Sequence, residues 1–263
     1  MKNRIQTLYW FIIRPRFYSE LFNRISKNFI SLNSGKNKDY GGPINNWYEE
    51  KAITAPQAFY QLTGNHMNES VREIYKEIFE TADALANTCP VKMGGPANID
   101  LLYWLSKHCG AKRIIETGVA YGWSSLAILL SIKDKNNSIL ISTDMPYPKL
   151  NNDKYVGCVI PDNLKTNWKL ISLPDKKAIP KAIRMIKNFD MCHYDSDKSY
   201  DGRLWCYKYL WNGLRNGGCF ISDDISDNYA FIDFSDQLEV LPTIVKSEDK
   251  YIGIIFKETG YKN

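Results

Sequence analysis

Short apolar runs alternate with helical stretches from residue 113 onward, and this alternation limits the possible folds more than any other feature of the sequence. The expected strands are 113–117, 138–143, 168–172, 190–194 and 218–222, and the expected helices between them are 123–132, 176–187 and 200–214. Strands that alternate with helices form a parallel sheet with helices on both faces. The sequence therefore predicts an α/β domain.

The end of the chain departs from this alternation. Two apolar runs, 243–247 and 251–256, are separated only by Glu248, Asp249 and Lys250. A connection this short predicts an antiparallel hairpin. The hairpin brings the expected sheet to seven strands, most of them parallel.

The region before residue 113 is helical in pattern, because apolar residues recur at helical spacing over 69–88 and 99–108. We therefore divide the chain into three parts. Residues 1–39 form a basic amphipathic arm, residues 40–97 form a helical cap or linker region, and residues 98–263 form the main domain.

Positive charge is concentrated in the arm. The chain has 34 Lys and Arg against 29 Asp and Glu, a net charge of +5. Residues 1–39 contain eight basic and two acidic groups, a net of +6, so the rest of the chain has 26 basic and 27 acidic groups, a net of −1. Broad nucleic-acid binding requires a basic face on the folded domain. The near-neutral main domain therefore excludes nucleic acid as an expected partner.

The arm also carries Phe17, Leu21, Ile25 and Phe29 at helical spacing, which predicts an amphipathic helix. Two interpretations are open for it. The helix packs on the main domain or on a partner subunit, or it makes a weak contact with a membrane surface, since basic and aromatic residues mix in interfacial helices. Aromatic-rich helices elsewhere in the chain make a homodimer a candidate assembly.

The cysteines bear on localisation. Six cysteines are scattered without a C-x-x-C pair, and the three histidines have no metal-binding spacing with them. Reduced thiols of this kind predict a cytoplasmic protein. The longest early apolar run, Leu8 to Ile13, is followed by Arg14 and Pro15 and is too short for a membrane span, so no signal peptide is expected.

Candidate ligand-binding residues follow the first strand of the main domain. Ligands bind beyond the carboxyl ends of the strands in an open α/β sheet. The segment E-T-G-V-A-Y-G at 116–122 lies at such an end, and its small residues Gly118, Ala120 and Gly122 allow a sharp turn close to a ligand. Tyr121 and Trp123 are placed to line the same pocket. A turn of this kind serves many ligands and does not identify one.

Acidic residues follow the next two strands. Asp144 lies where an acid can accept both hydroxyls of a ribose, and an ordinary turn aspartate is the alternative interpretation. Asp175, after the third strand, is a candidate contact for an adenine ring.

The fourth and fifth strands end in a group of four acids: Asp195, Asp197, Asp223 and Asp224. Carboxylates gathered at neighbouring strand ends repel one another unless a positive charge lies among them. Their oxygen donors suit Mg²⁺ or another divalent cation. The alternative is that some of them cap the helices that follow.

Taken in order, these segments resemble the class I S-adenosylmethionine-dependent methyltransferases, in particular the bacterial family related to catechol-type O-methyltransferases. The resemblance extends over about residues 98–257. It rests on Asp144 and on three motifs: E-T-G-V-A-Y-G-W-S-S at 116–125, F-D-M-C-H-Y-D-S-D-K-S-Y at 189–200 and L-R-N-G-G-C-F-I-S-D-D-I at 214–225. It implies a Rossmann-like fold and S-adenosylmethionine as the cofactor.

The resemblance also implies roles for individual residues. Glu116, Gly118 and Gly122 are expected around the methionine part of the cofactor, Ser124 at the start of the following helix, and Asp144 at the ribose. The remaining expected cofactor contacts are Ala120, Tyr121, Asp175 and Asp195. The implied metal ligands are Asp195, Asp223 and Asp224, and the implied catalytic residues are Lys198, as general base, and Asp195.

The expected function is methyl transfer from S-adenosylmethionine to an oxygen of a small molecule or sugar, with or without assistance by a divalent metal. A nucleotide-cofactor oxidoreductase is an alternative, because NAD would use the same turn and Asp144. The second alternative is a non-catalytic methyltransferase-like protein that docks through its basic arm.

Overall fold

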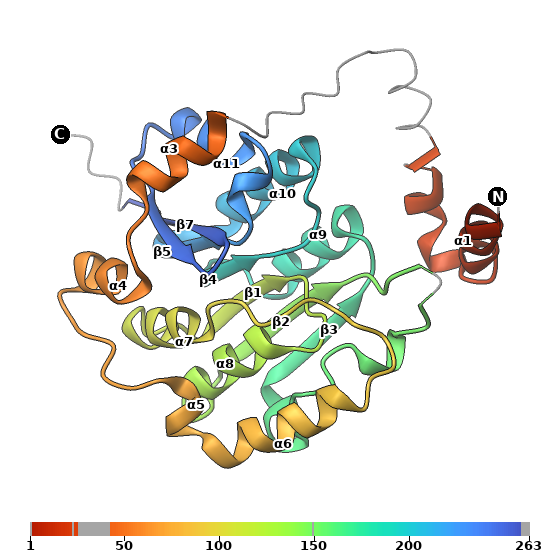
Figure 1. Ribbon diagram of the computed structural model, residues 1–263, viewed down its shortest axis with the longest axis horizontal. Coiled ribbons are helices and arrows are strands. Elements are labelled where there is room, and N and C mark those ends of the chain that lie inside the picture. Colours follow the sequence, from red (N-terminus) through yellow and green to blue (C-terminus); the bar gives the residue numbers. More distant parts are fainter. Residues whose placement is uncertain (1, 23, 26–42, 149, 259–263) are drawn as a thin grey trace.

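The computed structural model describes residues 2–22, 24–25, 43–148 and 150–258 (Figure 1). Its centre is a seven-stranded sheet formed by the described residues, in the order β3-β2-β1-β4-β5-β7-β6. The strands are β1 (Arg113–Thr117), β2 (Ile139–Asp144), β3 (Trp168–Ser172), β4 (Phe189–Tyr194), β5 (Leu214–Ser222), β6 (Thr243–Ser247) and β7 (Lys250–Phe256). Strands β1 to β5 are parallel, whereas β7 pairs antiparallel with both β5 and β6. The predicted α/β fold with a C-terminal antiparallel hairpin is confirmed.

Helices and short 3₁₀ turns surround this sheet. They are α1 (Lys2–Ile12), η1 (Pro15–Phe17), α3 (Pro43–Lys51), α4 (Ala55–Thr63), α5 (Val71–Ile74), α6 (Lys76–Asn87), α7 (Ile99–His108), α8 (Trp123–Ile132), η2 (Asp153–Tyr155), η3 (Asp162–Asn167), α9 (Asp175–Met185), α10 (Tyr200–Gly213), η4 (Ile225–Asp227) and α11 (Ala230–Gln237). Figure 1 shows α7 and α8 on one side of the sheet and α9, α10 and α11 on the other.

Each face of the sheet has its own apolar core. On one face, Leu105 of α7 and Leu129 of α8 pack in a cluster with residues of β1 and β2. On the other, Ile179 of α9, Tyr207 of α10 and Phe234 of α11 pack in a second cluster. All ten residues of α8 are buried, as expected for a helix that is apolar on every side. The sheet is therefore rigidly covered, and its strand ends are fixed in position.

The expected helix over 69–88 is divided in the structure. Ser70 forms the capping box with Glu73, which its sequence spacing predicts, and starts α5. Tyr75 then leaves the helical conformation, at φ −125° and ψ 43°, before α6 begins. Periodicity alone did not indicate this break, because the apolar positions of α5 and α6 remain in phase.

The arm contains one helix that the sequence pattern did not predict. Helix α1 precedes Arg14, and Pro15 then begins η1 at a position where proline, which lacks an N–H, is well tolerated. Residues 18–22, 24 and 25 are helical, in agreement with the expected amphipathic helix over the part that is described. The rest of that helix, with Phe29, lies outside the described residues.

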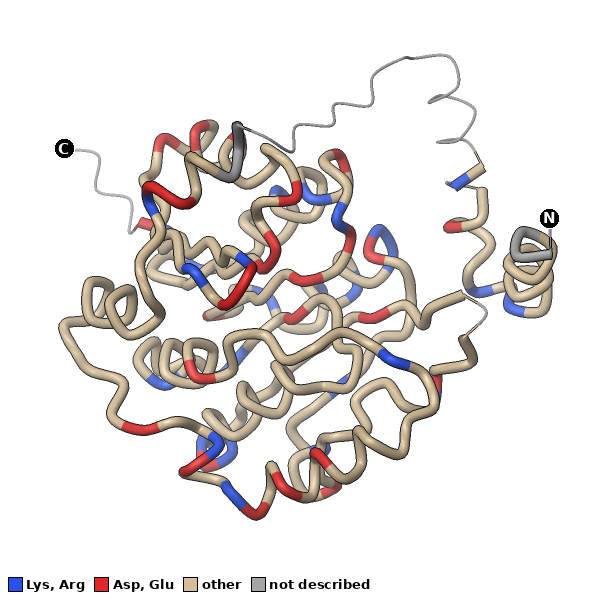
Figure 2. The backbone as a smooth tube through the Cα atoms, viewed as in Figure 1, with Lys and Arg blue, Asp and Glu red and all other residues tan. Residues whose placement is uncertain are grey.

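Searching the described ranges finds no helix with both the length and the apolar character needed to cross a bilayer. All six cysteines are free, as predicted. Figure 2 shows basic and acidic residues interspersed along the described part of the main domain.

Candidate active site

The turn between β1 and α8 has a backbone that depends on its small residues. Gly118, Ala120 and Gly122 all have positive φ, at 79°, 49° and 99°. A Cβ on residue 118 would lie 2.0 Å from the carbonyl oxygen of Asp195, so only glycine fits there. Ala120 adopts the left-handed conformation without being glycine, which costs of the order of 1 to 3 kcal/mol and is common at functional sites.

A buried carboxylate supports this turn from beneath. Glu116 is fully buried in β1, and it accepts hydrogen bonds from Ser124 (2.6 Å), Ser142 (2.7 Å) and Ser125. Two of these serines belong to the first turn of α8 and the third to β2. Glu116 and Ser124 therefore fix the turn to the sheet from the interior. Their contact with a cofactor stays a prediction of the resemblance.

Asp144, at the end of β2, holds the other side of the turn. Its Oδ2 accepts hydrogen bonds from the backbone N–H groups of Val119 (2.7 Å) and Ala120 (3.0 Å). Burial raises the pKa of Asp144, against the lowering effect of these two bonds. Within the described part of the chain, hydrogen bonds reach Oδ2 alone, so Oδ1 can accept a further hydrogen bond.

Tyr121 connects the turn to the segment before α7. Its hydroxyl donates to the carbonyl of Val91 (3.1 Å) and accepts from the backbone N–H of Met93 (3.2 Å). The predicted pocket-lining residue is thus anchored to the cap region. The neighbouring Trp123 is buried and stacks with Phe79 of α6 at a ring-centroid distance of 6.2 Å, so it belongs to the core.

The segment between β2 and β3 covers the turn, a contact that the sequence pattern did not indicate. The N–H of Gly157 donates to the carbonyl of Ala120 (2.9 Å), and the N–H of Val159 donates to that of Tyr121 (3.2 Å). A Cβ on Gly122 would lie 3.0 Å from the Cα of Gly157. Close backbone approach therefore fixes the glycine turn on this side also.

Asp175 begins α9 at the end of β3. Ser196, which follows Asp195 after β4, donates a hydrogen bond to Asp175 Oδ2 (2.7 Å). Burial raises the pKa of Asp175 to about 6. The structure therefore brings Asp175 to the strand-end loop that also carries Asp195.

The predicted metal ligands have cationic partners from the chain itself. Lys198 Nζ donates to Asp195 Oδ1 and also lies 2.7 Å from Asp224 Oδ2. Lys250 Nζ lies 2.9 Å from the other oxygen of Asp224, Oδ1. Over the described ranges, no group of three or more His, Cys, Asp or Glu side chains is arranged to hold a metal ion. In this arrangement the residues do not fit a divalent cation, because the ammonium of Lys198 bridges Asp195 and Asp224.

The charges of this cluster shift the ionisation of its members. Burial lowers the pKa of Lys198, but Asp195 and Asp224 outweigh that effect and hold it above its usual range. Burial, together with Asp223, raises the pKa of Asp195 to about 6 against the effect of Lys198. Burial also raises the pKa of Asp224, but Lys198 and Lys250 outweigh it and hold that pKa low. Lys198 is therefore an ammonium group, and the free amine required of a general base is disfavoured.

A buried histidine lies between two carboxylates beneath the cluster of Asp195, Lys198 and Asp224. His193 of β4 is fully buried, with Nδ1 3.5 Å from Glu116 Oε1 and Nε2 3.4 Å from Asp223 Oδ2. Burial lowers its pKa, but the two carboxylates outweigh this and raise it to about 10. His193 is thus interior, and as an imidazolium it balances Glu116 and Asp223. Glu116 and His193 are opposite each other in the register of β1 and β4. This contact could have been predicted only if that register had been known.

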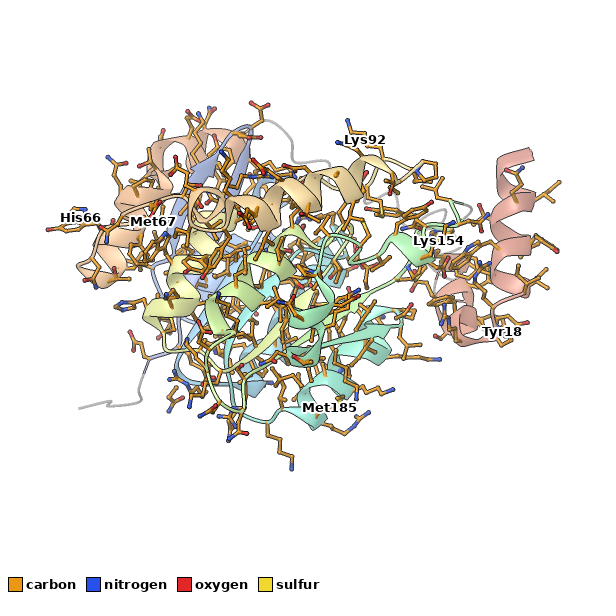
Figure 3. The ribbon with its side chains drawn as sticks, turned by 90° about the horizontal axis from the view of Figure 1, so that it is seen from below. Tyr18, His66, Met67, Lys92, Lys154 and Met185 are labelled. Atoms are coloured by element: carbon orange, nitrogen blue, oxygen red, sulfur yellow. The ribbon has the colours of Figure 1, made fainter. Side chains whose placement is uncertain are left out.

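A cavity of about 500 Å³ lies elsewhere, between α4 and α7. Its lining includes His66, Trp104 and His108. His108 ends α7 just before β1 begins, so this cavity lies towards the amino ends of the strands. Figure 3 shows His66 at the opposite side of the molecule from Tyr18 of the arm. The residues that line this cavity do not include Asp195, Lys198, Asp223 or Asp224.

Residues 115–225 match a family model described as a methyltransferase domain. No curated protein matches the chain. Among solved structures, the chain resembles the O-methyltransferase from Bacillus cereus in complex with SAH, with a TM-score of 0.55 and 14% identity over 80% of this chain and 100% of that one.

Two further structures have the same fold. One is the O-methyltransferase TomG from Streptomyces achromogenes, involved in tomaymycin synthesis and solved with SAM, with a TM-score of 0.54 and 14% identity over 80% of this chain and 98% of that one. The other is the SAH-bound methyltransferase PaMTH1 from Podospora anserina, with a TM-score of 0.51 and 16% identity over 84% and 97%.

These comparisons agree with the strand-end geometry. The matched residues 115–225 contain the glycine turn, Asp144, Lys198 and the acidic residues of the cluster. The nicotinamide oxidoreductase that the turn alone left open is not favoured. Residues 115–225 therefore resemble a methyltransferase domain, in a chain with a Rossmann-like methyltransferase fold.

Proposed function

We propose that the protein transfers a methyl group from S-adenosylmethionine to an oxygen atom of a small molecule or sugar. The observation that carries this proposal is the ammonium of Lys198 held between Asp195 and Asp224, at the strand ends beside the glycine turn. A hydroxyl acceptor must be oriented and must lose its proton during transfer. A carboxylate paired with an ammonium provides an acceptor for that proton and a positive charge for the oxygen.

The chain has suitable groups for the methyl donor. Asp144 Oδ1 is the candidate acceptor for ribose hydroxyls, and the turn at Gly118 permits the backbone to approach the ligand closely. Asp175 is the candidate contact of the adenine end. When bound, S-adenosylmethionine supplies the methyl group as an electrophilic carbon. Glu116, Asp144 and the segment around Gly157 hold the turn from three sides. The fixed turn in this way positions the ligand.

At the acceptor, Asp195 and Lys198 have different roles in this proposal. Asp195 accepts the hydrogen bond of the acceptor hydroxyl and takes its proton. Lys198 remains an ammonium and stabilises negative charge that develops on the acceptor oxygen. Asp224, at the end of β5, holds Lys198 in place, and Lys250 at the start of β7 pairs with the other oxygen of Asp224. The role of general base thus passes from Lys198, where the resemblance placed it, to Asp195.

The resemblance also implies a reaction in which a divalent metal assists the methyl transfer. A cation bound to Asp195, Asp223 and Asp224 would require Lys198 to leave two of those carboxylates. The observed ion pairs favour a reaction in which Lys198 supplies the positive charge. No step of the mechanism above depends on a metal.

Titration calorimetry with S-adenosylhomocysteine and, separately, with NAD⁺ tests the class of cofactor. Stoichiometric binding of S-adenosylhomocysteine at low micromolar concentration is expected, with no binding of NAD⁺. The opposite result would reject the proposal. Binding of neither ligand by the folded protein would favour the non-catalytic alternative.

A second experiment tests the acceptor atom. The enzyme is incubated with methyl-labelled S-adenosylmethionine and a pool of hydroxyl-bearing small molecules and sugars, and the linkage of the labelled methyl is determined. An oxygen linkage is expected, and transfer only to nitrogen or carbon would contradict it. Asp195→Asn is expected to lower the rate about a hundredfold or more, as for a proton acceptor, while S-adenosylhomocysteine affinity changes little.

A further inference from the structure

The arm, meaning here described residues 2–22, 24 and 25, has a small apolar core of its own. Trp10, Phe11 and Phe17 are buried, and the rings of Trp10 and Phe17 stack at 5.1 Å. Arg14 lies over the Trp10 ring at 4.6 Å, and Arg16 lies over the Phe17 ring at 4.7 Å. The core fixes α1 against the residues that follow it, so the outer face of α1 has a defined direction.

The outer face of α1 is apolar and exposed. Ile5, Leu8, Tyr9 and Ile12 recur at intervals of three and four residues and therefore share one face of the helix. Their exposed fractions are 63%, 47%, 63% and 52%. Figures 1 and 3 agree that α1 stands at the edge of the molecule, away from the sheet and its covering helices. A continuous row of large apolar side chains in this position marks an interaction surface.

The inner side of the arm is held to the main domain beside the candidate active site. Arg14 and Arg16 form ion pairs with Asp153 of η2, at 3.7 Å and 3.4 Å. Met145, which directly follows Asp144, packs against the aromatic core of the arm. Figure 3 shows Lys154, the neighbour of Asp153, on the side of the main domain nearest the arm. The arm is therefore oriented with its apolar face outward.

Charge identifies the partner that suits this face. The arm as defined here has five basic groups and one acidic group, a net charge of +4, from Lys2, Arg4, Arg14, Arg16, Arg24 and Glu20. Two copies of the arm would bring like charges together on contact, which disfavours a dimer through this face. An anionic lipid surface suits both the apolar face of α1 and the positive charge of the arm. It accepts apolar side chains below its headgroups and attracts basic residues beside them.

We propose that the arm docks the protein on an anionic membrane surface, with Ile5, Leu8, Tyr9 and Ile12 of α1 inserted among the lipids. The helix lies in the plane of the interface. The ion pairs to Asp153 then place the segment that follows Asp144 close to that surface. This inference does not rest on the proposed reaction, since it uses only the arm and its attachment.

Vesicle flotation with the full chain tests the proposal. The protein is mixed with phosphatidylcholine vesicles that contain phosphatidylglycerol, or with phosphatidylcholine alone. The test variant combines Ile5→Gln, Leu8→Gln and Ile12→Gln, since glutamine is a good helix former and retains α1. The control variant, Leu85→Gln, Met185→Gln and Leu241→Gln, removes three exposed apolar side chains that lie outside the arm.

The unmodified protein and the control variant are expected to float with anionic vesicles, and added salt is expected to weaken that binding. The test variant is expected to bind at least tenfold less, with an unchanged melting temperature and unchanged S-adenosylhomocysteine affinity. Equal binding by the test variant, or no binding by the unmodified protein, overturns the proposal. So does self-association in sedimentation velocity that the test variant abolishes while lipid binding is absent, because that result assigns the face to a second copy.

Discussion

Gly118 and Asp195 meet backbone to backbone at the ends of β1 and β4. The N–H of Asp195 donates to the carbonyl of Thr117 at 2.9 Å, and a Cβ on residue 118 would lie 2.0 Å from the carbonyl oxygen of Asp195. These strands are adjacent in the sheet at the point where the strand order reverses. Asp195 is therefore positioned by the same contact that shapes the glycine turn.

The first prediction follows from this contact. Gly118→Ala is expected to lower the free energy of unfolding by at least about 2 kcal/mol, because φ is +79° and the added methyl group overlaps a backbone oxygen. Chemical denaturation measures this loss. Gly95→Ala is the matched control, since a Cβ there has no neighbour within 4 Å. Equal stability of the two variants would show that the contact is not formed.

Asp144 allows the support of the turn to be separated from the binding of ribose. Asp144→Asn can still accept the two backbone hydrogen bonds through its amide oxygen, but it offers an NH₂ group where Asp144 offers Oδ1. A hydrogen bond to a charged group contributes about 1.5 to 3 kcal/mol. Affinity for S-adenosylhomocysteine is therefore expected to fall about tenfold to a hundredfold, with little change in melting temperature.

Asp144→Ala completes this comparison, because it removes the turn support as well. It is expected to lower the melting temperature and the affinity together. Calorimetric titration and thermal unfolding of the two variants provide the measurements. Unchanged affinity in Asp144→Asn would place the ribose elsewhere.

The sequence predicted the edge of the sheet at which the candidate site lies. Parallel strands point their carboxyl ends to the same side, so Asp144, Asp195 and Asp223 were expected at one edge of the sheet once the alternation of strands and helices was recognised. The turn at Gly118 was expected for the same reason. These inferences depend only on local pattern and on strand direction, both of which the sequence contains.

Contacts between distant segments were not predictable in this way. The ion pair of His193 with Glu116 depends on the register of β1 and β4, and the position of Lys198 between Asp195 and Asp224 depends on side-chain conformations. The hydrogen bond from Gly157 to the turn joins segments that share no periodic pattern. The group of acids at the ends of the fourth and fifth strands predicted a cation among them. It did not predict that this cation is the side chain of Lys198.

The competition between a lysine and a metal at this cluster is testable by binding of Mn²⁺, followed by electron paramagnetic resonance. The unmodified protein is expected to bind no stoichiometric Mn²⁺, because Lys198 bridges Asp195 and Asp224. Lys198→Met frees Asp195 and Asp224 of their shared cation, and it is expected to bind Mn²⁺ weakly, with no more than these two carboxylates as side-chain ligands. Lys250→Met is the matched control, since it removes an ion pair of Asp224 but leaves Lys198 in place.

The contrary result is equally specific. Stoichiometric Mn²⁺ binding by the unmodified protein, lost in Asp224→Asn, would support the metal site that the family resemblance implies. Lys198 would then have to move when the ion binds.

Asp175 gives a prediction for the dependence of stability on pH. Burial raises its pKa to about 6 in the folded chain, against about 3.9 in an unfolded one, so its contribution is complete at low pH and is lost as the pH rises through 6. Asp175→Asn has no charge to bury, and its stability relative to the unmodified protein is expected to increase between pH 4 and pH 7, by up to about 3 kcal/mol. Denaturation series at both pH values measure this difference.

Asp162 provides the control, because its pKa shifts in the opposite direction: a hydrogen bond from Lys165 lowers it. Asp162→Asn should therefore gain no stability relative to the unmodified protein as the pH rises. A pH-independent difference for Asp175→Asn would mean that Asp175 titrates normally and that the start of α9 is open to water.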